Sequence, residues 1–222
     1  DYRQSRFNSY QKDFELLKDR LYKIDTTKWP INYQVDWHII RAEMNGYDFN
    51  YKILKPWERD PAFYQTIWMY QSDVPAHEGP TNHRTLEFWT YDFPLNRDAE
   101  RKLEKELLVI PPLLNQAKEN LVGDAKDLWI AGIENFKEQK NNLETIKKRV
   151  GNANPPLLDA IEKSIAATNN FIYWLKDQAP NKTGPSGIGK ENYTWYQQNV
   201  HLLPMTWEEE VELLKRELDR AW

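Results

Sequence analysis

The chain has 222 residues, which is enough for one good-sized core or two small ones. A net charge of −4 leaves no basic patch of the kind that nucleic acid requires, and the lack of cysteine excludes disulfides, thiolate zinc ligands and cysteine nucleophiles. No apolar run approaches the roughly 18 residues of a membrane span. Aromatic residues make up 14% of the chain, which indicates large buried side chains or an aromatic-lined cleft.

Apolar residues recur every three or four positions along residues 2–24 and 31–54, and this period predicts two amphipathic helices. Over 31–54 two apolar stripes cover more than half of the circumference, so we expect this helix to be central rather than on the surface. Pro30 suits its first turn and Pro56 ends it. The first stripe consists of Ile31, Val35, Ile39, Ala42, Gly46, Phe49 and Ile53, and the second of Tyr33, Trp37, Ile40, Met44, Tyr47, Tyr51 and Leu54.

Four polar side chains interrupt this apolar helix: Asp36, His38, Arg41 and Glu43. They would either line a cleft or form an exposed polar edge with Asp/Arg and His/Glu pairs. Of the four, Arg41 is our candidate for contact with a substrate.

The middle of the chain is less regular. We predict a loop over residues 55–62, around KPWERDP. Over residues 63–72 we predict a helix, because an isolated strand would have no partner there. Residues 73–96 predict a long loop, in which LEFWTYDF forms a short strand or a helical turn. Tryptophan and tyrosine residues within 57–70 and 89–91 would form either an aromatic binding wall or ordinary core packing.

The second half of the chain predicts further helices. They span 97–122, with a break at Pro111-Pro112, then 125–150, 156–178 and 191–202. The last begins after Thr206, where Glu209 completes a capping box. Residues 179–190 form a Gly/Pro-rich loop. We therefore predict an all-α fold, an irregular multi-helix array of about seven helices with long loops around 55–62, 73–96 and 179–190, in one helical domain over 1–222.

Two segments invite a chemical interpretation. In AHEGPTNH (76–83), His77 and His83 are six residues apart with Pro80 between them, whereas a zincin requires two histidines four apart on one helix. A solvated loop is the better interpretation, so we assign this chain no catalytic residue, no metal ligand and no cofactor.

SGIGKENY (186–193) leads into the start of a helix, where backbone N–H groups suit an anion. It lacks the full phosphate-loop pattern. Gly187, Gly189, Lys190 and Tyr193 are therefore the candidate ligand contacts. The alternative is a plain loop before a helix.

Three segments resemble consecutive parts of a bacterial family that is catalogued as a domain of unknown function. They are VDWHIIRAEMNGYDFNYKILKPWERDPAFY (35–64), FPLNRDAERKLEKELLVIPPLLNQAKENL (93–121) and GIGKENYTWYQQNVHLLPMTWEEEVELLKRELDR (187–220). The likeness covers nearly the whole chain, in order, but only the N-terminal part of a family member. Members are all-helical and carry a zinc-peptidase-type motif, HEGxPGH, in their C-terminal half.

The resemblance implies that the chain is an N-terminal fragment of a longer, exported zinc-metallopeptidase-like hydrolase. It would form one wall of the substrate cleft and would be inactive alone. Zinc would be bound by the C-terminal catalytic half, which would be its partner, and a peptide would be the substrate. The loop would then lie near the cleft between the two halves, where a peptide carboxylate or peptide backbone would contact Gly187, Gly189, Lys190 and Tyr193. The location would be extracytoplasmic: periplasmic, secreted or lipid-anchored. The alternative is a non-enzymatic helical binding or interaction module.

Overall fold

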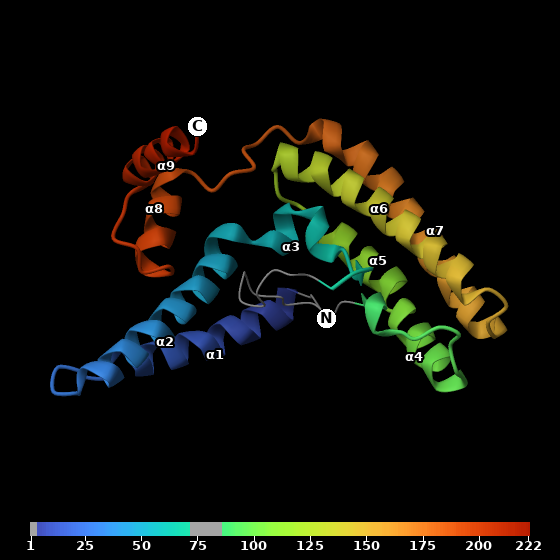
Figure 1. Ribbon diagram of the computed structural model, residues 1–222, viewed down its shortest axis with the longest axis horizontal. Coiled ribbons are helices and arrows are strands. Elements are labelled where there is room, and N and C mark those ends of the chain that lie inside the picture. Colours follow the sequence, from blue (N-terminus) through green and yellow to red (C-terminus); the bar gives the residue numbers. More distant parts are fainter. Residues whose placement is uncertain (1–3, 72–85) are drawn as a thin grey trace. The chain divides into compact units, whose positions relative to one another are not determined.

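The computed structural model describes residues 4–71 and 86–222 (Figure 1). The predicted all-α fold of about seven helices is confirmed, because nearly all regular structure in these residues is helical. The described residues form two compact units. Unit 1 contains residues 56–186, and unit 2 contains residues 4–55 and 187–222.

Unit 1 is built on two long helices, α6 (Lys126–Val150) and α7 (Pro155–Gln178), which lie side by side (Figure 1). Between them the rings of Phe136 and Phe171 are buried with their centroids 4.6 Å apart. Asn154 caps α7 by accepting a hydrogen bond from the Leu157 N–H at 3.0 Å. Further buried residues extend this core along both helices: Trp129, Leu143, Ile146, Ile161, Ile172 and Leu175.

Helices α4 (Arg97–Leu107) and α5 (Ile110–Asn120) pack against α7. The break between them comes at Leu108 and Val109, slightly earlier than predicted, and Pro111-Pro112 begin α5 instead of interrupting a helix. Prolines are tolerated there because first-turn N–H groups have no partner within the helix. The Ser164 hydroxyl of α7 donates to the Leu107 carbonyl at 2.9 Å and closes this interface.

The predicted loop over 55–62 contains regular structure. A short α-helix, α3 (Pro56–Arg59), is followed by a 3₁₀ turn, η2 (Pro61–Tyr64). Asp60 begins this turn by accepting a hydrogen bond from the Ala62 N–H at 2.9 Å. A second 3₁₀ turn, η4 (Ala179–Asn181), extends α7 into the loop predicted at 179–190.

The predicted helix over 63–72 is wrong. After η2 the chain extends, and β1 (Ile67–Trp68) pairs in parallel with β2 (Leu86–Glu87), which precedes a 3₁₀ turn, η3 (Phe88–Thr90). Residues 72–85 lie outside the described part of the chain. The LEFWTYDF segment thus contains both the short strand and the helical turn that we considered as alternatives.

Buried Gln139 on α6 explains how such a short strand is held. Its side-chain oxygen accepts a hydrogen bond from the Thr66 N–H at 2.9 Å, and its amide donates to the Thr168 hydroxyl at 3.3 Å. The Thr66 carbonyl then accepts from the Leu86 N–H at 2.6 Å. The strand is therefore stabilised by partners far away in the sequence, which periodicity cannot reveal.

Unit 2 contains α1 (Gln4–Tyr22), α2 (Ile31–Phe49), the π-helical extension η1 (Asn50–Leu54), α8 (Lys190–Asn199) and α9 (Trp207–Ala221). Helices α1 and α2 lie side by side (Figure 1), and the rings of Phe14 and Tyr47 pack with centroids 4.6 Å apart. Helix α8 packs on the C-terminal half of α2, where Phe49 stacks on Trp195 at 5.6 Å.

Helix α2 is only partly buried, which corrects the prediction that it would be central. Its first stripe is covered by α8 from Ala42 to Phe49. Earlier on the same stripe, Ile31 is 79% exposed and Ile39 is 50% exposed. The pattern correctly marks residues that can be buried, but α8 is too short to cover the N-terminal half of α2.

Candidate functional site

The segment that leads into the predicted site is held firmly at residues 182–186. The Asp124 carboxylate accepts hydrogen bonds from the N–H groups of Thr183 at 2.6 Å and Gly184 at 2.7 Å. The Ser186 hydroxyl accepts from the Asp127 N–H at 2.8 Å, which caps α6. The Arg59 guanidinium donates to the Ser186 carbonyl at 3.1 Å. These bonds fix the chain up to Ser186 within unit 1.

Beyond Ser186 the loop is open. A Cβ atom added to Gly187 or to Gly189 would meet no atom within 4 Å, whereas one added to Gly184 would lie 2.5 Å from the Asp124 carbonyl. Gly189 has φ of 83°, a left-handed conformation that favours glycine, and it is the residue from which α8 begins. Gly187 and Gly189 therefore leave the approach to the start of α8 unobstructed.

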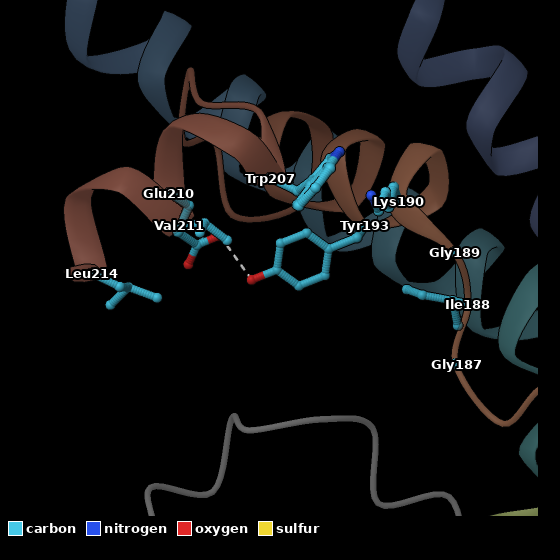
Figure 2. A pocket seen from close by; sticks show the side chains of 9 residues that line it. All are labelled: Gly187, Ile188, Gly189, Lys190, Tyr193, Trp207, Glu210, Val211 and Leu214. Carbon is cyan, nitrogen blue, oxygen red and sulfur yellow. Dashed lines mark hydrogen bonds between the residues drawn. The ribbon is translucent and has the colours of Figure 1, made fainter.

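This open loop forms one side of a pocket of about 450 Å³, a volume typical of sites for small ligands (Figure 2). The other side is the first two turns of α9. We call it the α8–α9 pocket. Its lining residues come from the loop and α8 (Gly187, Ile188, Gly189, Lys190 and Tyr193) and from α9 (Trp207, Glu210, Val211 and Leu214).

A hydrogen-bonded group joins the two sides of the pocket. The Tyr193 hydroxyl donates to the Glu210 carboxylate at 2.8 Å, which Figure 2 marks with a dashed line. The amide of buried Gln197 donates to the Tyr193 hydroxyl at 2.8 Å and to Glu210 at 3.2 Å. The hydrogen bond to Glu210 raises the pKa of the Tyr193 phenol above its ordinary value of 10.0, so this side chain stays protonated at neutral pH.

Lys190 provides the positive charge at the pocket. Its ammonium lies 3.7 Å from the centroid of the Trp207 ring, within the range of a cation–π interaction. Within the described part of the chain Lys190 is exposed and takes part in no ion pair. The negative charge of Glu210, in contrast, already accepts two hydrogen bonds.

The structure brings four of the five predicted site residues together, since Gly187, Gly189, Lys190 and Tyr193 all line the pocket. Arg41 does not line it. Its guanidinium lies 5.3 Å from the centroid of the Trp37 ring on α2, and Asp36, His38 and Glu43 are exposed on the same helix.

Sequence reasoning missed the contribution of α9. Trp207, Val211 and Leu214 follow each other at intervals of four and three, which places them on one face of a helix that the Thr206–Glu209 capping box starts. This signal was available in the sequence. What it lacked was any indication that the face would turn towards the loop before α8.

A second polar cluster in unit 2 surrounds Asp48, which lies almost buried between α1 and α2. Its carboxylate contacts the Lys18 ammonium at 2.5 Å and the Lys52 ammonium at 2.7 Å, and it accepts a hydrogen bond from Gln11 at 3.2 Å. Burial opposes ionisation of Asp48, but the bonds from Lys18 and Lys52 outweigh it and hold its pKa below the ordinary value of 3.8. The arrangement serves to join the two helices.

The AHEGPTNH segment lies outside the described residues. Among residues 4–71 and 86–222, no group of three or more His, Cys, Asp or Glu could hold a metal ion. In the same residues no helix is both long and apolar enough to cross a membrane. Of the aromatic residues considered as a binding wall, Trp57, Tyr64 and Tyr91 are buried in the core of unit 1, whereas Trp68 and Tyr70 are exposed.

Comparison of the chain with protein-family models, with curated proteins and with solved structures finds no match.

Proposed function

We propose that this chain forms one wall of the substrate cleft of a zinc-metallopeptidase-like hydrolase, and that it is inactive alone. The observation that carries the proposal is the α8–α9 pocket. Four residues predicted to contact a peptide, namely Gly187, Gly189, Lys190 and Tyr193, converge there with an apolar face of α9. An open loop next to an apolar surface suits a peptide, because the backbone approaches the glycines and a side chain contacts the helix.

The proposed role of the chain is to hold the substrate. Zinc bound in the C-terminal catalytic half that the family likeness implies would supply the chemistry, namely activation of a water for attack on the peptide carbonyl. Here the carboxylate of Glu210 is occupied by Tyr193 and Gln197, which suits a structural role for this side chain.

The partner of this chain would be that catalytic half. The N-terminal half of α2 supports this part of the proposal, because Ile31, Val35 and Ile39 continue a stripe that α8 already covers further along. Contiguous exposed apolar side chains mark surfaces at which another protein segment packs. Burying them against the catalytic half would complete the small core of unit 2.

The experiment is to follow the coding sequence beyond Trp222 and to assay the longer product. A downstream HExxH-type motif, together with peptide cleavage that a chelator abolishes and zinc restores, would support the proposal. The present chain should show no cleavage under the same conditions. A coding sequence that stops after Trp222, or a longer protein that cleaves no peptide in a diverse library, would overturn it.

A second candidate is a non-enzymatic binding or interaction module. The exposed residues of α2 favour it as much as they favour the first proposal, because they would serve any partner. The two candidates differ in zinc dependence. A binding module would retain its partner in the presence of chelator and would release no product from a peptide.

A further inference from the structure

We propose that the α8–α9 pocket binds the C-terminal residue of a peptide, with a bulky apolar side chain against α9 and the terminal carboxylate at Lys190. This inference rests on the proposed function, which makes the ligand a peptide. It goes further by stating which end of the peptide binds and which side chain the pocket prefers.

The preference for an apolar side chain follows from the walls. Val211 and Leu214 of α9 and Ile188 of the loop are aliphatic, and the Trp207 ring closes the end next to Lys190 (Figure 2). Leu214 is 59% exposed and Val211 is 36% exposed, so both still have apolar surface that a ligand would cover. Removal of apolar surface from water contributes roughly 25 cal/mol per Å².

The preference for a carboxylate follows from the charges. The pocket presents one ammonium, that of Lys190, and one carboxylate, that of Glu210. Glu210 accepts hydrogen bonds from Tyr193 and Gln197, whereas Lys190 has only the Trp207 ring and keeps donors for a ligand. Charge complementarity therefore favours an anionic group beside an apolar one, and the last residue of a peptide supplies both.

The test measures fluorescence anisotropy of an N-terminally labelled Gly-Gly-Ala-Leu peptide titrated with this chain at low salt. The free acid should bind about two- to five-fold more tightly than its C-terminal amide, as for an exposed ion pair. Lys190→Gln should abolish this preference, and so should about 0.5 M NaCl, because exposed charges are screened. A peptide that ends in alanine should bind more weakly than the leucine peptide.

The matched variants are on one face of α9. Leu214→Ala removes part of the pocket wall and should weaken binding by about three- to ten-fold. Leu218→Ala, one turn further and outside the lining, should leave binding unchanged. Circular dichroism of each variant checks that the helices remain folded.

Four results would overturn the inference: equal binding of acid and amide, an acid preference that survives Lys190→Gln, equal effects of Leu214→Ala and Leu218→Ala, or equally strong competition by octanoate. Octanoate that competes as strongly as the leucine peptide would show that the pocket takes any apolar carboxylate rather than a peptide end. The measurement needs neither zinc nor catalysis. Equal binding of acid and amide would therefore overturn the C-terminal ligand alone and leave the hydrolase proposal to the cleavage assay, and an inactive longer protein would leave a measured binding site standing.

Discussion

Replacement of Gly132 by alanine has two opposing effects on the stability of unit 1: a gain in helix propensity and a steric clash with Pro61. Gly132 is buried in the interior of α6, where alanine is favoured over glycine by about 0.8–1.0 kcal/mol of helix propensity. The new Cβ, however, would lie 2.6 Å from Cβ and 3.0 Å from Cγ of Pro61 in η2. The proline ring cannot rotate away, and overpacking of this kind costs about 1–3 kcal/mol. We therefore expect Gly132→Ala to lower the free energy of unfolding of unit 1 by about 1 kcal/mol.

The assay is hydrogen exchange of the α6 and α7 amides, because a chain with two compact units need not unfold in one step. Pro61→Gly removes the atoms that the new methyl group would meet, so on that background Gly132→Ala should stabilise α6. A coupling free energy of about 1–3 kcal/mol between the two substitutions is expected. Gly187→Ala is the control, since its Cβ would enter open space. Stabilisation by Gly132→Ala in the otherwise unchanged protein would refute the reasoning.

Three further substitutions test local interactions. Ser186→Ala should speed hydrogen exchange in the first turn of α6, because a lost cap costs about 1 kcal/mol; unchanged exchange would show that the cap is dispensable. Burial raises the pKa of the Asp60 carboxyl above its ordinary value of 3.8. The folded protein therefore loses stability as the pH rises above 3.8 and this group must ionise. Asp60→Asn removes that loss, so it should raise the thermal midpoint at pH 7 but not at pH 3. A gain of equal size at both pH values would contradict this reasoning. The pKa of Asp48 is lowered, because the bonds from Lys18 and Lys52 outweigh the opposing effect of burial. The ionised Asp48 therefore stabilises the folded protein above pH 3.8, and this stabilisation is lost on acidification. Asp48→Asn should cost about 1–3 kcal/mol at pH 7 and less at pH 3, and an equal loss at both would count against a charge effect.

The helices were predictable because their signals are local. The Thr206–Glu209 capping box marks the start of α9, and the period of apolar residues gives α6 and α7 nearly to the residue. The short strand at Ile67 was not predictable, since it depends on Gln139 and Leu86, which are distant in sequence. Likewise, the cap of α6 is supplied by Ser186, about sixty residues later in the chain.

The sequence predicted the side of the α8–α9 pocket formed by the loop and α8, but not the side formed by α9. The loop residues Gly187, Gly189 and Lys190 stood out because glycines before a helix leave room for a ligand. Arg41 was chosen for its polar character within an apolar helix; it lies over the Trp37 ring and outside the lining of the α8–α9 pocket, and its contact with a substrate stays a prediction. The wall formed by α9 depends on how that helix folds back towards α8, which is a tertiary property that periodicity does not determine.

The central claim is that this chain holds a peptide for hydrolysis by a zinc-dependent partner half. Its most direct test is the steady-state kinetics of peptide cleavage by the longer protein with Leu214→Ala or Leu218→Ala, alongside the zinc content of each variant. We predict cleavage that a chelator abolishes, and a KM that Leu214→Ala raises about three- to ten-fold with kcat and bound zinc unchanged. Leu218→Ala should behave like the unaltered protein. Absence of zinc-dependent cleavage, or a KM unaffected by Leu214→Ala, would contradict the claim.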